Sequence, residues 1–332
     1  TIGILGGGQL GRMLAVAAAR LGFRTHIFEP GANPPAGDVA HTLTTAGYDD
    51  VDALTAFAKS VDIVTFEFEN IPTDALDVIE NITPIRPNRE ALRTSQDRLV
   101  EKQFLEGLGL TVAPFADIAN AADLEAAITT IGAPSILKTR RFGYDGKGQW
   151  RIGSREEAEA LDLPDTPCIL EGFVQFECEF SVILARRADG TVAFWESSQN
   201  GHEDGNLARS TLPGAAIIGQ QVGEARRLAQ AVADKLSYVG VLTLEFFASE
   251  SGPIFNEMAP RVHNSGHWTQ NGCTVDQFEQ HIRAVTGLPL GDGQRQNDVV
   301  MENLIGDDMD RVPALLAERD TAVHLYGKAE TK

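Results

Sequence analysis

The residues best suited to chemistry lie in the stretch KTRRFGYDGKGQW, from Lys138 to Trp150. It holds four basic side chains against one acid, Asp145, although the whole chain has a formal net charge of −19. Gly143, Gly146 and Gly148 allow the backbone to approach a ligand closely or to adopt positive φ. Such a loop can hold polyphosphate through its amides and lysines. It lacks the GxxxxGK[ST] pattern of a P-loop, and the alternative is a flexible hairpin with incidental basic residues.

A second group of candidates is acidic and lies in VGVLTLEFFASESGPIFNEM, residues 239–258. The stretch predicts two antiparallel strands, and a turn centred on Ser251 places Glu245 opposite Glu257. Two facing carboxylates repel each other unless a cation lies between them, and Mg²⁺ with nucleotide phosphates is the usual case. Asn256 would leave the other face of an ideal strand, so it can join the site only at a bulge or strand end. The alternative is one protonated or salt-bridged glutamate.

The segment RVHNSGHW follows directly and brings Arg261, His263, Asn264 and His267 close to the proposed metal. Two histidines four positions apart are compatible with zinc, but no third ligand has a recognisable spacing. A pocket for a small anion, with Arg261 as its cation, therefore fits better.

Further carboxylates occur beside or within apolar strands. Glu67 and Glu69 lie at the C-terminal end of the strand VDIVTFEF, where open α/β sheets bind ligands, and share one face. They could equally be two solvated acids. Glu171, Glu177 and Glu179 stand among apolar strand residues and need partners. Glu179 could accept hydrogen bonds from ribose hydroxyls or form an ion pair within the sheet.

The opening TIGILGGGQLG predicts a strand, a glycine turn and a helix. Gly6, Gly8 and Gly11 satisfy GxGxxG, and Glu29 ends the next strand 18 residues beyond Gly11, which nearly completes the fingerprint of dinucleotide-binding folds. A hydride-transfer enzyme is therefore a serious rival, although any open α/β sheet can use glycines at such a turn.

The helix N-terminus after these glycines favours an anion under either interpretation. Our hypothesis is that this anion is a substrate phosphate, with Gln9 and Leu10 near it. Alternating strands and helices up to the strand ITPIRP predict a parallel sheet with helices on both faces. One long helix is expected over NREALRTSQDRLVEKQFLEGLG, with Arg98 inside it, and a final strand over TAVHLYGK.

Composition limits the function classes. The acidic balance disfavours nucleic acid and anionic membranes as partners. No apolar run approaches the ~20 residues of a membrane span, and no signal peptide is expected. The three cysteines are odd in number and lack metal-ligand spacing, so they predict free thiols in a cytoplasmic protein.

The motifs together resemble the ATP-grasp superfamily, and within it the 5-(carboxyamino)imidazole ribonucleotide synthase family of purine biosynthesis. The matching segments run from GGGQLGRM through TFEFENIP, QDRLVEKQFL, the 138–150 loop and FNEMAPRVHNSGHWT to HLYGKAE. The resemblance implies an α/β and α+β ATP-grasp fold in three parts. Residues 1–95 form a Rossmann-like domain, 96–290 an ATP-grasp domain with a lid at about 112–172 that includes the loop 143–149, and 291–332 a small C-terminal domain.

The resemblance also implies a ligase that carboxylates 5-aminoimidazole ribonucleotide with ATP, Mg²⁺ and bicarbonate, through carboxyphosphate, and a homodimer. It assigns Lys138 and the glycine loop to phosphate, with Tyr144 of the loop also touching the ribonucleotide and so coupling lid closure to acceptor binding. The residues that it assigns to ATP are Arg98, Lys138, Gly143, Tyr144, Asp145, Gly146, Lys147, Gly148, Gln149, Glu171, Gly172, Phe173, Val174, Glu179, His202, Asn256 and Glu257.

Three smaller sets follow from the same resemblance. Glu245 and Glu257 become the Mg²⁺ ligands. The catalytic set at bicarbonate is Lys138, Arg261, His263 and Asn264, and the ribonucleotide set is Gln9, Leu10, Glu67, Glu69, Tyr144 and Lys328. A basic segment usually follows YGKAE in this family, so part of the substrate-phosphate site is expected to be missing from a sequence that ends at Lys332.

Three other functions stay open at this point. The first is another ATP-grasp ligase, such as a formate-using glycinamide ribonucleotide enzyme. The second is the NAD-dependent oxidoreductase suggested by the opening glycines. The third is a regulator that binds ATP without bicarbonate-dependent turnover.

Overall fold

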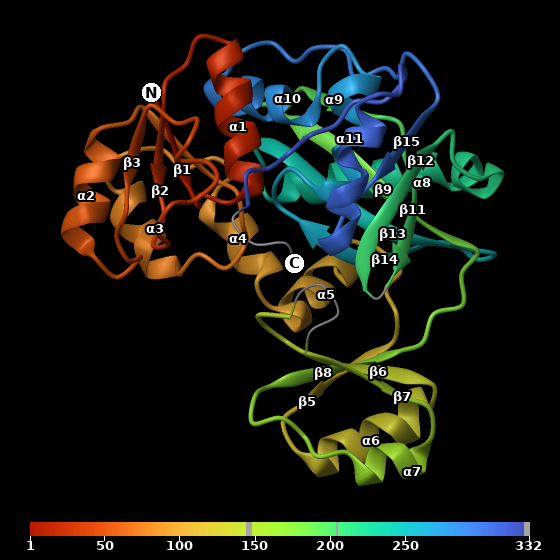
Figure 1. Ribbon diagram of the computed structural model, residues 1–332. Helices are drawn as coiled ribbons and strands as arrows, with labels where there is room; N and C mark the ends of the chain where they lie inside the picture. The colour runs from red at the N-terminus through yellow and green to blue at the C-terminus, as the bar shows by residue number, and fades with distance from the viewer. Residues whose placement is uncertain (144–147, 204, 329–332) are drawn as a thin grey trace.

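Three β-sheets organise the chain in the computed structural model, which describes residues 1–143, 148–203 and 205–328 (Figure 1). The loop residues Tyr144, Asp145, Gly146 and Lys147 lie outside the described residues, and so do the predictions made for them.

The first sheet is the parallel sheet that the sequence predicts, with the order β3-β2-β1-β4. Strands β1, β2 and β4 are buried along their whole length, because helices cover the sheet. The predicted strand ITPIRP is reduced to one bridge between Ile85 and Val64. The elements are β1 (Ile2–Leu5), β2 (Thr25–Phe28), β3 (Thr42–Thr44) and β4 (Ile63–Phe66), with helices α1 (Gln9–Arg20), α2 (Val51–Lys59) and α3 (Thr73–Glu80).

The single long helix predicted after the first sheet is wrong: the chain forms two helices, α4 (Arg89–Ser95) and α5 (Arg98–Glu106). Asp97 separates them because its backbone is extended and its carboxylate accepts hydrogen bonds from the amides of Leu99 and Val100. This is an N-cap, which favours the start of a new helix over the continuation of the first. Arg98 consequently becomes the first residue of α5.

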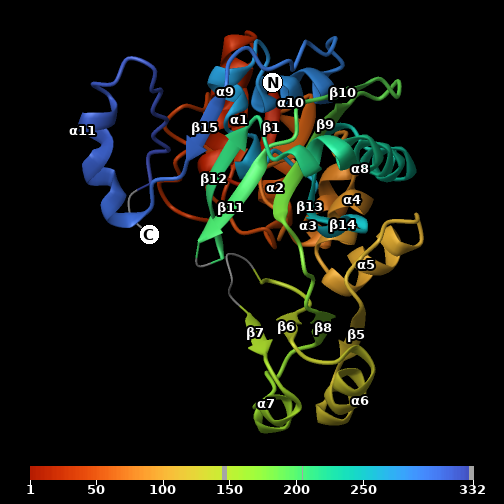
Figure 2. The same cartoon turned by 90° about the vertical axis from the view of Figure 1, so that its right-hand side faces the viewer.

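A small four-stranded sheet forms the lobe that projects away from the rest of the molecule in Figures 1 and 2. Its order is β5-β8-β6-β7, and it has its own apolar core with two helices. The glycine loop connects β6 to β7. The elements are β5 (Phe115–Ile118), α6 (Ala121–Ile131), β6 (Ser135–Thr139), β7 (Gln149–Ile152), α7 (Arg155–Ala160) and β8 (Cys168–Gly172).

The large sheet has the order β14-β13-β9-β11-β12-β15, with β10 paired to β9. Alternation along β9 builds two cores: Val182 and Leu184 pack with α8, whereas Ile183 and Ala185 pack with α1 and α10. The elements are β9 (Cys178–Arg186), β10 (Val192–Phe194), β11 (Gln199–Glu203), β12 (Asn206–Leu212), α8 (Ala216–Lys235), β13 (Gly240–Ser249), β14 (Gly252–Ala259), η1 (Asn264–Gly266), α9 (Thr269–Gly272), α10 (Gln277–Thr286) and β15 (Val299–Glu302).

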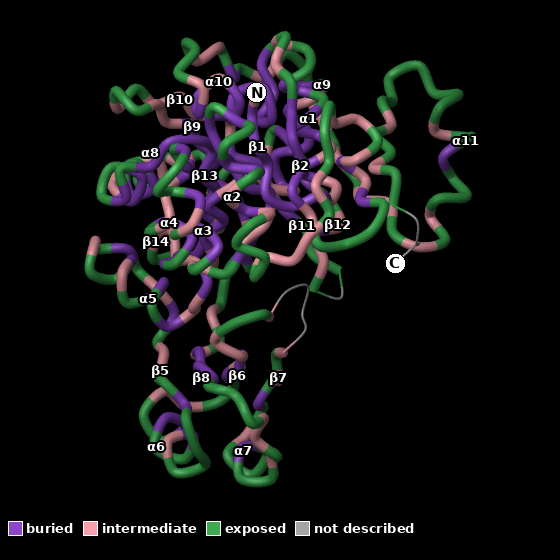
Figure 3. Tube along the Cα trace, turned by 90° about the vertical axis from the view of Figure 1, so that its left-hand side faces the viewer, coloured by how far each residue is buried: buried purple, intermediate pink, exposed green. Residues whose placement is uncertain are grey.

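Figure 3 shows that buried residues gather around β1, β9 and β13, whereas the lobe of the small sheet is mostly exposed or half-buried. The molecule therefore consists of a large packed body and a thinner lobe, and the boundary between them runs past α5.

The last part of the chain returns to the large sheet, because β15 pairs with β12. The short helices η2 (Gly306–Arg311) and α11 (Val312–Leu315) follow. The predicted strand TAVHLYGK is wrong: residues 321–328 form neither helix nor strand, although Tyr326 packs against the core that contains α1. Within the described residues, no helix is long and apolar enough to cross a membrane.

Candidate functional site

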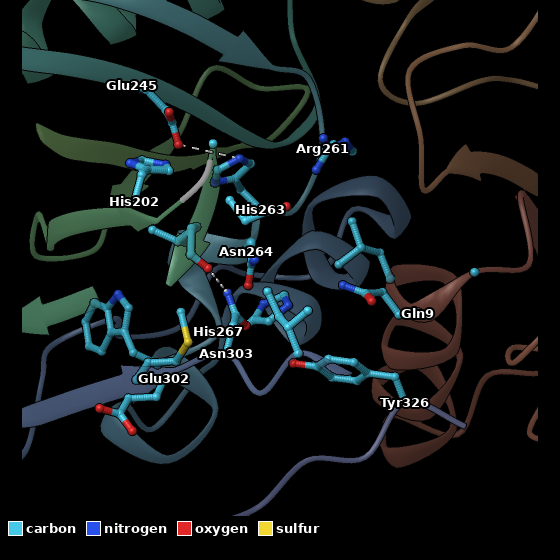
Figure 4. A pocket seen from close by; sticks show the side chains of 18 of the residues that line it. Gln9, His202, Glu245, Arg261, His263, Asn264, His267, Glu302, Asn303 and Tyr326 are labelled. Carbon is cyan, nitrogen blue, oxygen red and sulfur yellow. Dashed lines mark hydrogen bonds and ion pairs between the residues drawn. The ribbon is translucent and has the colours of Figure 1, made fainter. Parts of the chain in front are cut away.

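A cavity of about 2030 Å³ opens where the three sheets meet, and most of the residues singled out in the sequence line it. Its walls come from α1, the end of β4, α5, the lobe, the hairpin β13–β14 and the tail. Figure 4 shows the part of the wall that lies between Gln9, Glu245 and Tyr326. The predicted residues in its lining are Gln9, Leu10, Glu67, Glu69, Arg98, Lys138, Gly143, Gln149, Glu179, His202, Glu245, Asn256, Glu257, Arg261, His263, Asn264 and Lys328.

The hairpin β13–β14 places Glu245 directly opposite Glu257, as predicted. The turn, however, is one residue shorter than expected, because Ser249 pairs with Gly252. A regular ladder from that turn would put Glu245 opposite Asn256. The register instead shifts between Glu245 and Phe246, so Asn256 is an extra, bulged residue. Because of this bulge, the neighbouring residues Asn256 and Glu257 can both line the same cavity.

The two facing glutamates have opposite electrostatic environments. Arg98 Nη1 lies 3.3 Å from Glu257 Oε2. Low solvent access would by itself raise the pKa of Glu257, but Arg98 and Lys138 outweigh it and lower that pKa. The pKa of Glu245 rises to about 8, first because its surroundings hold little solvent and then because Glu257 faces it. The pair therefore behaves as one carboxylate and one carboxylic acid near neutral pH.

A possible metal-ligating group adjoins Glu245. Ligand atoms of Glu179, His202 and Glu245 all lie within 4.8 Å of one another. His202 Nδ1 lies 3.0 Å from Glu179 Oε2. Burial opposes the charged imidazole, but Glu179 and then Glu245 raise the pKa of His202 above its usual value.

Lys138 does not stand alone in the phosphate region. Its Nζ lies 3.0 Å from Glu171 Oε2, and Lys102 Nζ lies 3.3 Å from the same oxygen. Burial alone would raise the pKa of Glu171, but Lys138 and then Lys102 lower it to about 2. Glu171 is therefore a fixed anion that holds two lysines at the boundary between the lobe and α5.

The predicted anion pocket brings Arg261, His263 and Asn264 together on the wall shown in Figure 4. Arg261 Nη2 lies 2.9 Å from Glu69 Oε1. This ion pair joins a residue predicted to bind bicarbonate to one predicted to bind the ribonucleotide. His263 Nε2 lies 3.6 Å from Glu245 Oε1. Burial and then the charge of Arg261 lower the pKa of His263 well below its usual value, so the ring is neutral.

The glycine turn before α1 is filled by the protein's own carboxylates. Glu67 accepts hydrogen bonds from the amides of Gly8 at 2.6 Å and Gly11 at 2.9 Å. Glu29 accepts one from the amide of Gly7 at 2.8 Å. A dinucleotide pyrophosphate would need these amides, and it would meet two anions there. The oxidoreductase interpretation therefore loses its structural basis.

Glu67 also competes with our hypothesis of a substrate phosphate at this helix N-terminus. The amides of Gly8 and Gly11 already serve the Glu67 carboxylate, which is buried. Burial raises the pKa of Glu67, and the hydrogen bonds from Gly11 and Gly8 counteract it. Gln9 and Leu10 line the cavity beside this cap.

Some predicted nucleotide residues lie outside the cavity lining. Glu171 is buried beneath Lys138, and Gly172 ends β8. Phe173 is largely exposed, with the Arg151 guanidinium 5.2 Å from the centre of its ring. Gly148 and Val174 are likewise absent from the lining.

Sequence reasoning missed two charged residues of α5. Lys102 is 2% exposed and holds Glu171. Glu101 is equally buried, lines the cavity and accepts a hydrogen bond from the Met258 amide at 3.0 Å. Both lie in the matching segment QDRLVEKQFL, where two adjacent charges on a helix that packs against other elements could have signalled buried partners.

Comparison with known proteins identifies the class of this fold and site. The ATP-grasp domain family matches residues 103–278, and the ribonucleotide synthetase preATP-grasp domain family matches residues 1–96. The chain is therefore an ATP-grasp protein that carries the preATP-grasp domain of ribonucleotide synthetases, and the predicted fold class is confirmed.

Individual relatives define the family more narrowly. The N5-carboxyaminoimidazole ribonucleotide synthase of Brucella melitensis is 52% identical over 100% of this chain and 93% of its own length. The crystal structure of the corresponding Thermus thermophilus synthetase has a TM-score of 0.92 at 43% identity and covers 99% of this chain and 90% of that one. An Aspergillus clavatus synthase crystallised with ADP and 5-aminoimidazole ribonucleotide has a TM-score of 0.93 at 29% identity, over 100% and 90% of the two chains.

The chain belongs to the N5-carboxyaminoimidazole ribonucleotide synthase family, which confirms the resemblance seen in the motifs. It is thereby placed among the ATP-grasp ligases of purine biosynthesis.

Proposed function

We propose that this chain converts ATP, bicarbonate and 5-aminoimidazole ribonucleotide into ADP, phosphate and N5-carboxyaminoimidazole ribonucleotide. Membership of the family supports the reaction, and the Aspergillus relative in complex with ADP and 5-aminoimidazole ribonucleotide supports the substrate classes. The observation that carries the proposal is one continuous cavity. Lys138 and Glu257 line it together with Arg261, Asn264 and Gln9.

The lobe supplies the residues for the phosphates of ATP. Lys138 reaches the cavity from β6, and Gly143 and Gln149 border it at the two sides of the glycine loop. Phosphoryl transfer requires charge neutralisation and in-line positioning more than covalent chemistry. Glu171 keeps the ammonium of Lys138 in place, and Glu179 with His202 forms an acceptor-rich edge suited to the ribose hydroxyls.

The hairpin carboxylates fit magnesium. Glu245 and Glu257 offer hard oxygen donors on adjacent strands, and their mutual repulsion calls for a cation. When bound there, Mg²⁺ would neutralise charge on the phosphates of ATP. Arg98 acts on the same region by holding Glu257, and Asn256 adds an amide beside it through the bulge.

The Arg261 region suits bicarbonate. A bicarbonate oxygen attacks the γ-phosphorus of ATP, the bond from that phosphorus to the bridging β-phosphate oxygen breaks, and ADP leaves, giving carboxyphosphate. The exocyclic amine of the ribonucleotide then attacks the carboxyl carbon, the bond to phosphate breaks, and the amine loses a proton. The guanidinium of Arg261 counters the charge of the carboxyl oxygens, and the neutral ring of His263 holds its place beside Glu245. Exclusion of water by the lobe would protect carboxyphosphate from hydrolysis.

The deciding assay measures ADP release with ATP, Mg²⁺ and bicarbonate, with and without 5-aminoimidazole ribonucleotide. We expect release to depend on the ribonucleotide, and its independence would contradict the proposal. Replacing bicarbonate with formate, and the acceptor with glycinamide ribonucleotide, tests the related ligase. ATP binding without any turnover would point to a regulator.

Two further properties concern assembly and location: the family supports the first, and the three free cysteines support the second. We propose that the chain forms a homodimer and acts in the cytoplasm. Light scattering coupled to size-exclusion chromatography tests the first property, and the expected mass is twice the 35.8 kDa of the chain. Fluorescence microscopy of a tagged protein in its host tests the second.

A further inference from the structure

His267 lines the cavity and has one ring nitrogen bound within the protein, whereas the other has no partner among the described residues. The residue is 5% exposed and lies between η1 and α9. Its Nδ1 lies 3.0 Å from Gln277 Nε2. Its Nε2 is buried and finds no hydrogen-bond partner in the described part of the chain, and the residue lines the cavity. A buried polar atom of this kind signals an unmet contact.

The orientation of the Gln277 amide is fixed by the backbone of His263. The His263 amide donates to Gln277 Oε1 at 2.9 Å, and Gln277 Nε2 donates to the His263 carbonyl at 2.7 Å. If the Gln277 amide were flipped, its NH₂ group would face the His263 N–H and its oxygen would face the His263 carbonyl. Both contacts would be repulsive, so the flipped orientation is excluded. Gln277 is fully buried at the start of α10, and its own amide donates to Thr269 Oγ1 at 3.0 Å.

This orientation determines the tautomer of His267. The second hydrogen of Gln277 Nε2 points to Nδ1, which must therefore offer its lone pair. The proton of the neutral ring then lies on Nε2. Burial, followed by the charges of His324 and Arg261, lowers the pKa of His267 to about 3, so the ring stays neutral. Nε2 is thus a fixed N–H donor without a lone pair for a metal or a proton.

We propose that His267 is a substrate-binding residue, which Gln277 positions so that its Nε2–H donates to an oxygen of an anionic substrate group. The inference rests on the proposed function for the identity of the substrates. The group is either the carboxyl oxygen derived from bicarbonate or the phosphate of the ribonucleotide, which share the same acceptor chemistry.

The surroundings of His267 favour such an oxygen. Arg261 lies close enough to influence the charge of His267. Figure 4 shows His267 near Asn264 and Tyr326, and the His267 and Tyr326 rings lie 5.9 Å apart. The positive charge of Arg261 beside the Nε2–H donor of His267 suits an anion.

His281 provides an internal control with the same chemistry. Its Nδ1 accepts a hydrogen bond from the Val241 amide at 3.1 Å, and its Nε2 lies 2.7 Å from Thr65 Oγ1. Burial lowers its pKa to about 3 as well. Both histidines therefore have the Nε2–H tautomer, but only His267 borders the cavity.

Nitrogen-15 NMR of the histidine rings tests the tautomer and the ligand contact without turnover. Both rings should show a protonated Nε2 and an unprotonated Nδ1, unchanged from about pH 5 to pH 8. Added bicarbonate with MgADP, or added 5-aminoimidazole ribonucleotide, should shift the His267 Nε2–H signal and leave that of His281 in place. The opposite tautomer, or a His267 signal that neither substrate shifts, would overturn the proposal even if the enzyme is active.

Kinetics separates the two sources of the oxygen. His267→Phe should raise one KM by roughly 10- to 100-fold, the loss expected for one charge-assisted hydrogen bond. An increase for bicarbonate assigns the carboxyl group, and an increase for the ribonucleotide assigns its phosphate. His267→Gln, which keeps an N–H donor, should recover most of the loss, and His281→Gln should leave both KM values unchanged. A fall in kcat alone, or no recovery with glutamine, would refute the assignment.

Discussion

Glu171, buried next to the cavity, and Glu245, in its wall, differ in how neighbouring charges act on a carboxyl group that has little contact with solvent. Glu171 sits between Lys138 and Lys102, and its pKa falls to about 2. Glu245 faces Glu257 across the hairpin, and its pKa rises to about 8. Loss of solvent raises both pKa values, so the neighbouring charges decide the outcome.

The ion cluster of Glu171, Lys138 and Lys102 is complete without a ligand, and we call it the finished cluster. The Glu245–Glu257 pair needs a bound cation, and we call it the incomplete cluster. The Glu171 carboxylate is fully compensated by two lysines and can orient Lys138 before any nucleotide binds. Arg98 pairs with Glu257 and His202 pairs with Glu179, but these cations compensate the carboxylates around Glu245 only in part. Glu245 therefore holds a proton in place of the missing positive charge. A metal ion with ATP would replace that proton.

The strongest test of the comparison removes a charge from the incomplete cluster. Glu257→Gln should lower kcat by at least about 100-fold, because several kcal/mol of charge stabilisation at the phosphates depends on the metal. Steady-state ADP release measures the loss. Glu250→Gln in the exposed turn of the same hairpin is the matched control and should have a normal rate. Near-normal turnover in Glu257→Gln would contradict the assignment.

Removing a charge from the finished cluster should instead affect stability. Lys102→Met leaves Glu171 with one cation, and we expect the free energy of unfolding to fall by about 3 kcal/mol, because an ionised group stays buried with fewer partners. Urea denaturation measures it, with the exposed Lys59→Met as control. An unchanged midpoint would show that Lys138 alone is sufficient.

The two clusters predict opposite responses to pH. Glu245 binds a proton in the folded state between about pH 4.5 and about pH 8, where the unfolded chain does not. Its contribution to stability is complete below about pH 4.5 and is lost as pH rises to about 8, with a slope of at most about 1.4 kcal/mol per pH unit. Glu171 contributes above about pH 4.5, and this contribution is lost as pH falls towards about 2.

Unfolding measured at several pH values in wild type and Glu245→Gln isolates the first effect. Glu245→Gln resembles the protonated acid, so the two proteins should be about equally stable below about pH 4.5, and the wild type should become the less stable of the two as pH rises to about 8. MgATP should bind the wild type more tightly as pH increases. Metal affinity that is independent of pH would show that Glu245 does not exchange its proton for the cation.

The smallest expected effect concerns Glu179, which adjoins the incomplete cluster. If it binds the ribose, Glu179→Gln should raise the KM for ATP about 3- to 10-fold, as expected for one hydrogen bond, and leave the Mg²⁺ dependence unchanged. A large shift in Mg²⁺ dependence would place Glu179 with His202 and Glu245 as a metal ligand.

The sequence allowed the parallel sheet and the Glu245–Glu257 pair to be predicted, because strand periodicity and motif spacing are local properties. It did not reveal the break at Asp97, since a capping aspartate inside an amphipathic pattern is also an ordinary surface residue. Lys102 was missed because its partner Glu171 is far away in the chain. The glycine turn was misleading for the same reason: Glu67, which fills it, arrives from another strand.

The bulge at Asn256 makes chain length, and not only residue type, a requirement of this site. Side chains alternate along a strand, so a single residue added or removed between the turn and Glu257 exchanges the faces of every position beyond the change. What matters is whether the number of residues changes by an odd or an even number. Adding or removing two residues keeps Glu257 on the same face as Glu245, whereas adding or removing one residue turns it to the other face. Among functional relatives, this hairpin should therefore tolerate substitution far better than a change of one residue in its length.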